Sequence, residues 1–396
     1  MSEHEGLVSL IKIIVLMGGV MTGAAYLVLV ERWIAAWVQM RRGPNRVGIP
    51  LTRIRLFGLG QPLADGLKFI FKEEFVPAHV DRWLFTLAPV VMMTSALAIY
   101  AAIPFGSVLP PAPALGWTEP LPLLVAPGLD VGLVYVLAIS SIAVYGVILG
   151  GWSSNNKYGL LGALRSSAQL ISYELPLGLG LLGVVLMTGS LRLDTIIQQQ
   201  AETGVWFAFT QPLGMVVFVI AAFAEAARLP FDLPEAEQEL IGGYHTEYSG
   251  MRLLLFLTSE FIHMITASFL IVILFLGGWH LWGVTGSGES VGWGIAIVRL
   301  IVLLAKILLV VLFFMLVRWT WPRFRFDQLM ALCWKVLLPL GMVNLAAVAV
   351  FSEFAGDSSS WLLVLAGWLV LAAAWIVTAL IAPQIADNRP RVELPE

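Results

Sequence analysis

The chain has 396 residues, of which 59% are apolar and only 12% are charged. Soluble globular domains carry about 45–50% apolar and about 25% charged residues, and a single water-soluble core cannot bury so large an apolar excess. The composition therefore argues against a soluble enzyme and for a polytopic helical membrane protein. The net charge of −3 predicts no nucleic-acid partner.

The cysteine and histidine content limits the metal chemistry of the chain. Cys333 is the single cysteine, so disulfides and cysteine-ligated zinc or iron–sulfur sites are excluded within this chain. The five histidines are scattered without paired metal-ligand spacing. We therefore expect no metal site, and any electron carriers must belong to partner proteins.

Nine apolar runs are long enough to cross the hydrocarbon core, which needs about 20 residues per helix. They cover residues 7–30, 84–109, 131–151, 166–188, 206–227, 252–279, 293–317, 331–351 and 361–382. We expect an all-α fold in which residues 1–382 form a single transmembrane bundle of about nine helices. Residues 383–396 are expected to form a tail.

The basic residues predict the orientation of this bundle. The segments that follow the first, third, fifth, seventh and ninth runs hold 18 of the 23 Lys and Arg residues, when Arg252 at the first position of the sixth run is counted with the loop before it. Because basic loops stay on the cytoplasmic side of a membrane, we expect the N-terminus outside and the C-terminus in the cytoplasm.

The first cytoplasmic loop contains an amphipathic segment at residues 61–72. Its polar residues stand at positions 61, 65, 68 and 72, and the other face is apolar, with Leu63, Leu67, Ile70 and Phe71. This spacing predicts a helix that lies in the membrane interface. The alternative is a helix docked on a partner protein.

The third cytoplasmic loop is acidic, whereas the other cytoplasmic loops are basic. Its five acids are Asp232, Glu235, Glu237, Glu239 and Glu247. Asp232 and Glu235 have the spacing of a helix N-cap and its capping-box partner. The alternative is a plain solvated loop, but several apolar residues in the segment argue against it.

Three further acids lie inside the apolar runs, in their cytoplasmic halves. At 1.5 Å per residue, Glu174 and Glu260 lie about 12 Å below the membrane edge, and Glu225 is close to that edge. A charge facing lipid costs at least about 2.5–3.5 kcal/mol, so these carboxyls should face the bundle interior or a wet cavity, where proton relays are built.

We expect His263, one turn after Glu260, to be a packing histidine. Lys306 lies near mid-span, where its ammonium cannot easily reach the interface.

Four stretches resemble one protein family, in order and over most of the chain from about residue 7 to 340. They are residues 31–45, 151–174, 225–239 and 322–330. The first reads Glu31-Arg32 through Arg41-Arg-Gly-Pro-Asn45, and the third reads Glu225-Ala-Ala-Arg228-Leu-Pro-Phe-Asp232. These motifs resemble the H-subunit (subunit 1) family of NADH:quinone oxidoreductase, respiratory complex I.

The resemblance implies a role as the quinone-chamber and coupling subunit of a proton-translocating oxidoreductase. Such a subunit joins the peripheral redox arm to antiporter-like membrane subunits. It binds quinone as substrate and contacts membrane lipid, while FMN and iron–sulfur clusters belong to its partners. The ninth apolar run is absent from mitochondrial members and present in some bacterial ones, which favours a bacterial inner membrane.

By motif match, the resemblance also implies roles for individual residues. The quinone chamber and its mouth would involve Glu31, Arg32, Arg41, Asp65, Lys68 and Arg228. The acidic coupling loop would comprise Glu225, Asp232, Glu235, Glu237, Glu239 and Glu247. The intramembrane proton path would begin at Glu174 and Glu260, with Arg165 as its neighbour. The stretch from Arg46 to Gly60 is several residues longer than the common family pattern.

Three alternatives remain at this level. A membrane-bound hydrogenase or another donor-linked complex uses a homologous subunit without NADH, and co-purifying subunits would distinguish it. A stand-alone proton-coupled transporter should show inverted repeats, and the sequence contains no convincing internal repeat. A purely structural membrane anchor would tolerate neutral substitutions at Glu174 and Glu260.

Overall fold

The computed structural model describes residues 3–48, 57–111, 120–232, 242–286, 292–355 and 360–385. Regular structure in these residues is almost entirely helical. The exception is a two-stranded antiparallel sheet of β1 (Val108–Leu109) and β2 (Leu121–Pro122), in which Val108 pairs with Pro122. The prediction of an all-α membrane protein is confirmed.

Eight helical runs in the described residues are long and apolar enough to cross a membrane. They are α1 (Glu3–Val38), α3 (Arg82–Ala98) with η1 (Ile99–Ala101), α4 (Gly132–Ser153), α5 (Lys157–Thr188), α10 (Gly250–Phe275), α11 (Trp293–Thr320), the run of α12 (Phe326–Leu332), η4 (Cys333–Leu337) and α13 (Leu338–Ala355), and α14 (Ser360–Ile385). The shorter helices are α2 (Gln61–Phe71), α6 (Leu193–Thr203), α7 (Phe207–Thr210), α8 (Pro212–Glu225) and η3 (Gly243–His245).

The fifth expected span, residues 206–227, is not one continuous helix. It is divided at Gln211 into the single turn α7 and the 14-residue helix α8. Proline disfavours the helical conformation in the residue before it, and Gln211 before Pro212 adopts φ −131° and ψ 58°. At 1.5 Å per residue α8 is about 21 Å long, which is shorter than a hydrocarbon core of about 30 Å.

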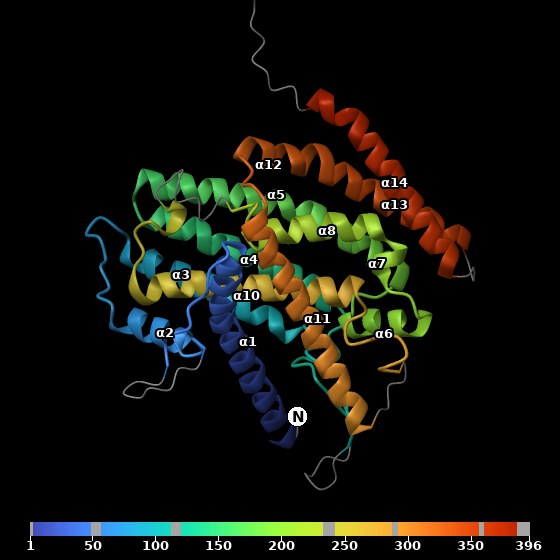
Figure 1. Ribbon diagram of the computed structural model, residues 1–396, viewed down its shortest axis with the longest axis horizontal. Coiled ribbons are helices and arrows are strands. Elements are labelled where there is room, and N and C mark those ends of the chain that lie inside the picture. Colours follow the sequence, from blue (N-terminus) through green and yellow to red (C-terminus); the bar gives the residue numbers. More distant parts are fainter. Residues whose placement is uncertain are drawn as a thin grey trace, which may run out of the picture.

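The helix α10 lies at the centre of the bundle, and every residue from Ser259 to Phe275 is buried. It packs against α3, α8 and α11, and α1 packs across it. In Figure 1, α1 and α11 cross the other long helices, and α2 lies at one end of the bundle while α6 and α7 lie at the other. The red helix α14 lies at the edge, where it packs on α7, α8 and α13.

Glycines allow several of these helices to approach closely. A β-carbon at Gly146 of α4 would lie 2.8 Å from the β-carbon of Met92 in α3. One at Gly180 of α5 would lie 3.0 Å from the carbonyl oxygen of Gly214 in α8. Small residues at helix crossings are typical of membrane bundles, in which close backbone packing supplies much of the association energy.

The amphipathic helix predicted in the first cytoplasmic loop forms as α2. None of its residues is buried. Its apolar side chains are exposed by 68%, 46%, 59% and 82% at Leu63, Leu67, Ile70 and Phe71 respectively. This apolar face is therefore available to a membrane or to a partner, the two alternatives that the sequence leaves open.

Candidate functional site

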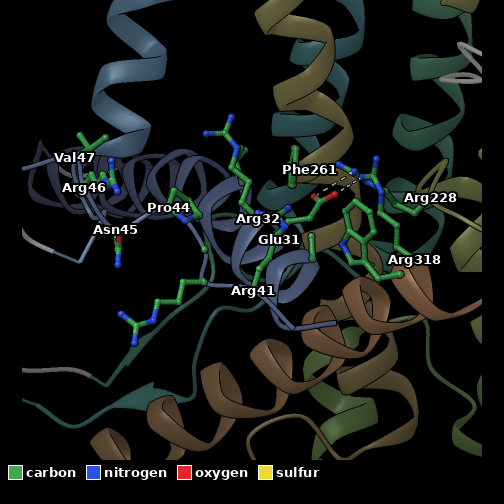
Figure 2. A pocket seen from close by; sticks show the side chains of 15 residues that line it. Glu31, Arg32, Arg41, Pro44, Asn45, Arg46, Val47, Arg228, Phe261 and Arg318 are labelled. Atoms are coloured by element: carbon green, nitrogen blue, oxygen red, sulfur yellow. Dashed lines mark ion pairs between the residues drawn. The ribbon is translucent and has the colours of Figure 1, made fainter. Parts of the chain in front are cut away.

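A cavity of about 1090 Å³ lies between α1, the segment that follows α1, the middle of α10 and the C-terminal end of α11. Its lining is strongly cationic, with one acid, Glu31, among the described residues that form it. The cations are Arg32, Arg41, Arg42, Arg46, Arg228 and Arg318. Figure 2 shows several of these side chains around Glu31, with Arg46 lying apart from it.

Glu31 is the centre of a buried ion-pair cluster in this cavity. One carboxylate oxygen lies 2.6 Å from Arg318 Nη1, and the other lies 3.6 Å from Arg228 Nη1. The guanidinium of Arg228 also lies 4.1 Å from the ring centroid of Phe261, a cation–π distance. The side chains of Arg228 and Glu31 are 4% and 12% exposed, so this cluster is shielded from solvent and fixes α1 against α11 (Figure 2).

The mouth of this cavity is tied to α2. Arg32 Nη1 of α1 lies 2.7 Å from Asp65 Oδ2 of α2. Lys68, which the sequence placed with these residues, is exposed and does not line the cavity; its ammonium lies 5.4 Å from the centroid of the Phe69 ring. The structure therefore brings Arg32 and Asp65 together, and Lys68 lies apart.

A second, much smaller cavity of about 30 Å³ lies deeper in the bundle. All three intramembrane acids, Glu174, Glu225 and Glu260, line it. The hydroxyl of Tyr244 donates a hydrogen bond of 3.0 Å to Glu260 Oε1. A volume of this size holds about one water molecule, so the three carboxyls share one small polar site.

His263 also lines this small cavity and is 8% exposed. Its Nε2 atom has no hydrogen-bond partner among the described residues. The sequence predicted a packing histidine with its polar atoms satisfied, whereas the structure places an unsatisfied ring nitrogen beside three carboxyls.

The two cavities share a wall. On α10, Phe261 lines the large cavity while its neighbour Glu260 lines the small one. Glu225, the last residue of α8, lines the small cavity, and Arg228, in the segment that follows, lines the large one. A movement of α10 near residues 260–261, or of the chain near residues 225–228, would therefore change the shape of both cavities.

The segment from Glu225 to Asp232 is held by contacts from other helices. Gln169 Nε2 of α5 donates to the carbonyl oxygens of Ala224 and Phe231, at 2.9 Å and 2.7 Å. Arg323 Nη2 donates to Asp232 Oδ2 at 2.9 Å. Ala227 adopts a φ of +51°, a left-handed conformation that costs a residue with a side chain about 1–2 kcal/mol. These contacts hold a strained turn beside the two cavities.

The other predicted site residues lie farther from the cavities. Glu247 accepts a hydrogen bond of 2.7 Å from Asn156 Nδ2, and the Arg165 guanidinium lies 5.4 Å from the centroid of the Phe326 ring. Neither residue lines a cavity described above. The remaining acids of the loop, and with them the capping box proposed for Asp232, lie outside the described residues: Glu235, Glu237 and Glu239.

Sequence reasoning missed four residues that complete the site. Arg318 was counted only as a topology signal, and Phe261 and Tyr244 were treated as ordinary apolar residues. Gln169 gave the clearest signal, because it is a polar residue in an apolar run, five positions before Glu174. In the part of the chain that the structure describes, no group of three or more His, Cys, Asp or Glu residues could hold a metal ion.

Comparison with known proteins identifies the family. The family model described as NADH dehydrogenase matches residues 11–349. The chain is 49% identical over 85% of its length to an H-type subunit of the NADH-quinone oxidoreductase of Geobacter metallireducens, with 94% of that protein covered. The chain belongs to the H-subunit family of NADH-quinone oxidoreductase.

Other members are similar over comparable lengths. An H-type subunit of the NADH-quinone oxidoreductase of Geobacter sulfurreducens is 48% identical over 84% of this chain and 93% of its own length. The NADH-quinone oxidoreductase subunit 8 of Rhodothermus marinus is 44% identical over 83% of this chain and 92% of its own. The chain is thus a multi-pass membrane subunit of a multi-subunit oxidoreductase, and the helix α14 lies beyond the matched residues.

Proposed function

We propose that this subunit forms the quinone chamber of the complex and relays quinone reduction to proton translocation. The observation that carries the proposal is the shared wall between the arginine-lined cavity and the three-carboxyl cavity. Phe261 and Glu260 are adjacent residues of α10, and Phe261 lines the arginine-lined cavity while Glu260 lines the three-carboxyl cavity. A change of charge in the arginine-lined cavity would therefore act on the carboxyls over a short distance.

The large cavity suits a quinone. Its volume of about 1090 Å³ is slightly larger than the about 300–1000 Å³ found for small-molecule sites. A quinone that accepts electrons becomes more negative before it is protonated. The arginines around Glu31 would stabilise that charge in a site of low dielectric.

The turn from Glu225 to Asp232 is the proposed coupling element. A new negative charge in the large cavity would compete with Glu31 and Asp232 for Arg228, Arg318 and Arg323. Rearrangement of these ion pairs would move a turn whose first residue, Glu225, lines the small cavity. Such a switch of charge pairs is a common way to bias an element that has two states. In this proposal Glu235, Glu237 and Glu239 extend the coupling loop, and Lys68, Arg41, Arg165 and Glu247 keep the roles that the resemblance implies.

The proposal includes the setting of the subunit. Electrons would reach quinone from FMN and iron–sulfur clusters in the peripheral arm, and this chain would bind no redox cofactor. Protons entering at Glu174 and Glu260 would continue to antiporter-like subunits. The subunit would lie in a bacterial inner membrane with its N-terminus outside and its C-terminus in the cytoplasm.

The test uses Glu225→Gln and Asp232→Asn in the assembled complex. NADH oxidation by ferricyanide, which draws electrons from the peripheral arm, should stay normal, while quinone reduction and proton pumping should fall at least about tenfold, because about 1.4 kcal/mol of lost transition-state stabilisation has that effect. The control is Glu202→Gln, which neutralises an exposed acid on α6. Normal quinone reduction and pumping in both variants would refute the proposal.

The alternatives give different results in the same preparation. Nickel–iron hydrogenase subunits that co-purify with the chain in place of an NADH-oxidising arm would favour a donor-linked relative. Solute transport by the isolated chain in proteoliposomes would favour a transporter. Pumping that survives Glu174→Gln and Glu260→Gln would favour a structural anchor.

A further inference from the structure

His263 of α10 is a buried base to which the proposed function gives no role. It is 8% exposed and lines the three-carboxyl cavity. Its Nε2 atom has no hydrogen-bond partner among the described residues, although a buried polar group without a partner destabilises a fold. An unsatisfied buried group in a native protein is often explained by a catalytic role or by a bound water. His263 therefore calls for an explanation beyond packing.

His263 is also the one basic side chain among the described residues that line this cavity. Three helices each contribute an acid to the same lining: Glu174 of α5, Glu225 of α8 and Glu260 of α10. Like charges repel strongly at the low dielectric of a protein interior, and the described lining includes neither Lys nor Arg to balance them. An imidazolium at His263 is therefore the counter-charge that this lining can itself form.

Helix geometry places His263 beside Glu260. The two residues are three positions apart on α10, and side chains at this spacing are neighbours on a helix surface. Nε2 makes no direct hydrogen bond to a carboxyl, but the cavity of about 30 Å³ has room for about one water molecule. In the neutral tautomer that carries its proton on Nδ1, Nε2 is an acceptor. It can therefore receive a proton through that water.

Other titratable and charged groups also lie near this part of α10. Tyr244 lines the cavity and donates to Glu260. Thr266, one turn beyond His263, donates to the hydroxyl of Tyr100 at 3.2 Å. Three charged residues line the large cavity on the other side of the shared wall: Glu31, Arg228 and Arg318. These two arginines pair with the glutamate and do not line the small cavity, so they do not replace His263 as its base.

We propose that His263 is a further proton-carrying residue of the relay, an inference that rests on the proposed function. A carboxylic acid of the cavity gives its proton to the water, and the water passes a proton to His263 Nε2. The O–H bond of the acid breaks, an N–H bond forms on the ring, and a carboxylate then faces an imidazolium. The reverse transfer restores the neutral ring and delivers the proton to another carboxylate. The acids can thus exchange protons while the net charge of the cavity stays constant.

The test is His263→Gln in the assembled complex. Glutamine keeps a polar side chain but takes up no proton. Quinone reduction and proton pumping should fall at least about tenfold, because a positioned acid–base group commonly contributes about 10²–10⁴-fold, while NADH oxidation by ferricyanide stays normal. The matched control is His280→Gln, because His280 is also buried but lines neither of the two cavities. It should leave both activities unchanged.

The pH profile separates a proton-carrying role from a packing role. A packing defect lowers the rate by the same factor at every pH, whereas loss of an acid–base group removes its ionisation from the profile. Profiles of quinone reduction in the wild type and in His263→Gln, each normalised to its maximum, should therefore differ in shape. Normal rates in His263→Gln, or normalised profiles that coincide, would overturn the inference.

A density map of the wild-type complex serves where His263→Gln does not assemble. Nε2 should lie within about 3.2 Å of a carboxyl oxygen or a water in the cavity, the range of ordinary hydrogen bonds. A ring that is turned out of the cavity and bonded only to backbone carbonyls would overturn the inference. The proposed function fails separately: normal quinone reduction in His263→Gln, together with its loss in Glu225→Gln, would remove His263 from the relay and leave that function standing.

Discussion

The ion-pair cluster around Glu31 makes a quantitative prediction for the variant Glu31→Gln. The substitution keeps the shape of the side chain and removes the negative charge that pairs with Arg228 and Arg318. The two guanidinium groups, which are 4% and 18% exposed, then lose the carboxylate that they share. We expect the bundle to be destabilised where α1 meets α11.

The magnitude follows from the distances. At an effective dielectric constant of about 20, Coulomb attraction is about 6 kcal/mol for the pair at 2.6 Å and about 5 kcal/mol for the pair at 3.6 Å. Desolvation of three charges offsets much of this gain. Removing one partner of a buried pair costs about 3–5 kcal/mol, and we expect a loss in that range.

The assay uses the single cysteine of the chain. Cys333 is fully buried in the same core cluster as Leu27 of α1 and Val317 of α11. When opening is fast relative to labelling, thiol modification follows the population of the open state. In mild denaturant, Glu31→Gln should speed labelling of Cys333 at least about 100-fold, since each 1.4 kcal/mol is a factor of ten.

A double-mutant cycle separates the ion pair from other effects of the substitution. Replacing Arg318 by Gln in the Glu31→Gln background removes the buried charge that has lost its Glu31 partner and should recover more than half of the lost stability. Glu202→Gln, at an exposed site on α6, should leave labelling unchanged. Labelling within about threefold of wild type in Glu31→Gln, which corresponds to less than about 0.7 kcal/mol, would refute the reasoning.

Two further substitutions test contacts at the two ends of α10. Lys306 donates hydrogen bonds to three backbone carbonyls that follow α10, at 2.6, 3.0 and 2.6 Å. The variant Lys306→Met should therefore lower the free energy of unfolding by about 2–5 kcal/mol, measured by the rate of Cys333 labelling. Its control, Lys335→Met, changes an exposed position and should have little effect. Glu74 Oε1 accepts a hydrogen bond from the backbone amide of Met251 at 3.0 Å. The variant Glu74→Ala should lower the stability of α10 at this end by about 1 kcal/mol, as for the loss of a helix cap, and should speed hydrogen exchange of the Met251 amide about fivefold. The control variant Glu73→Ala should leave this exchange unchanged. Unchanged labelling in the first case, or unchanged exchange in the second, would show that the contact does not stabilise α10.

The helices could be predicted because hydropathy reports lipid exposure directly. The 32 residues of α5 extend beyond the expected run at 166–188, because the helix begins at Lys157, where the side chain of Asn156 caps it by accepting a hydrogen bond from the amide of Tyr158. The division at Gln211 was signalled by the following proline but was outweighed by the apolar residues on both sides. A short apolar helix such as α8 cannot be recognised from hydropathy when another helix precedes it directly.

The candidate site was predictable only in part. Charged residues within apolar runs stand out, and this identified Glu174, Glu225 and Glu260, which the structure brings together in one cavity. Of the partners of Glu31, Arg228 was placed in the same chamber by the resemblance, but Arg318 could not be predicted, because it lies 287 positions away and spacing along the chain does not report which helices meet. Tyr244 was overlooked for the same reason: an aromatic residue in a loop does not reveal that its hydroxyl reaches Glu260.

The burial of α10 explains how this bundle accommodates ionisable groups at membrane depth. A helix that is buried all round has no lipid-facing side, and α10 is enclosed by α1, α3, α8 and α11. Glu260 and His263 therefore avoid the cost of contact with hydrocarbon. Protection from lipid also means that any change in their charge must be compensated by neighbouring protein groups, and Glu174 and Glu225 line the same small cavity. In the proton path that we propose, the protonation of each of these acids would therefore depend on the others, which is the property that a proton relay requires.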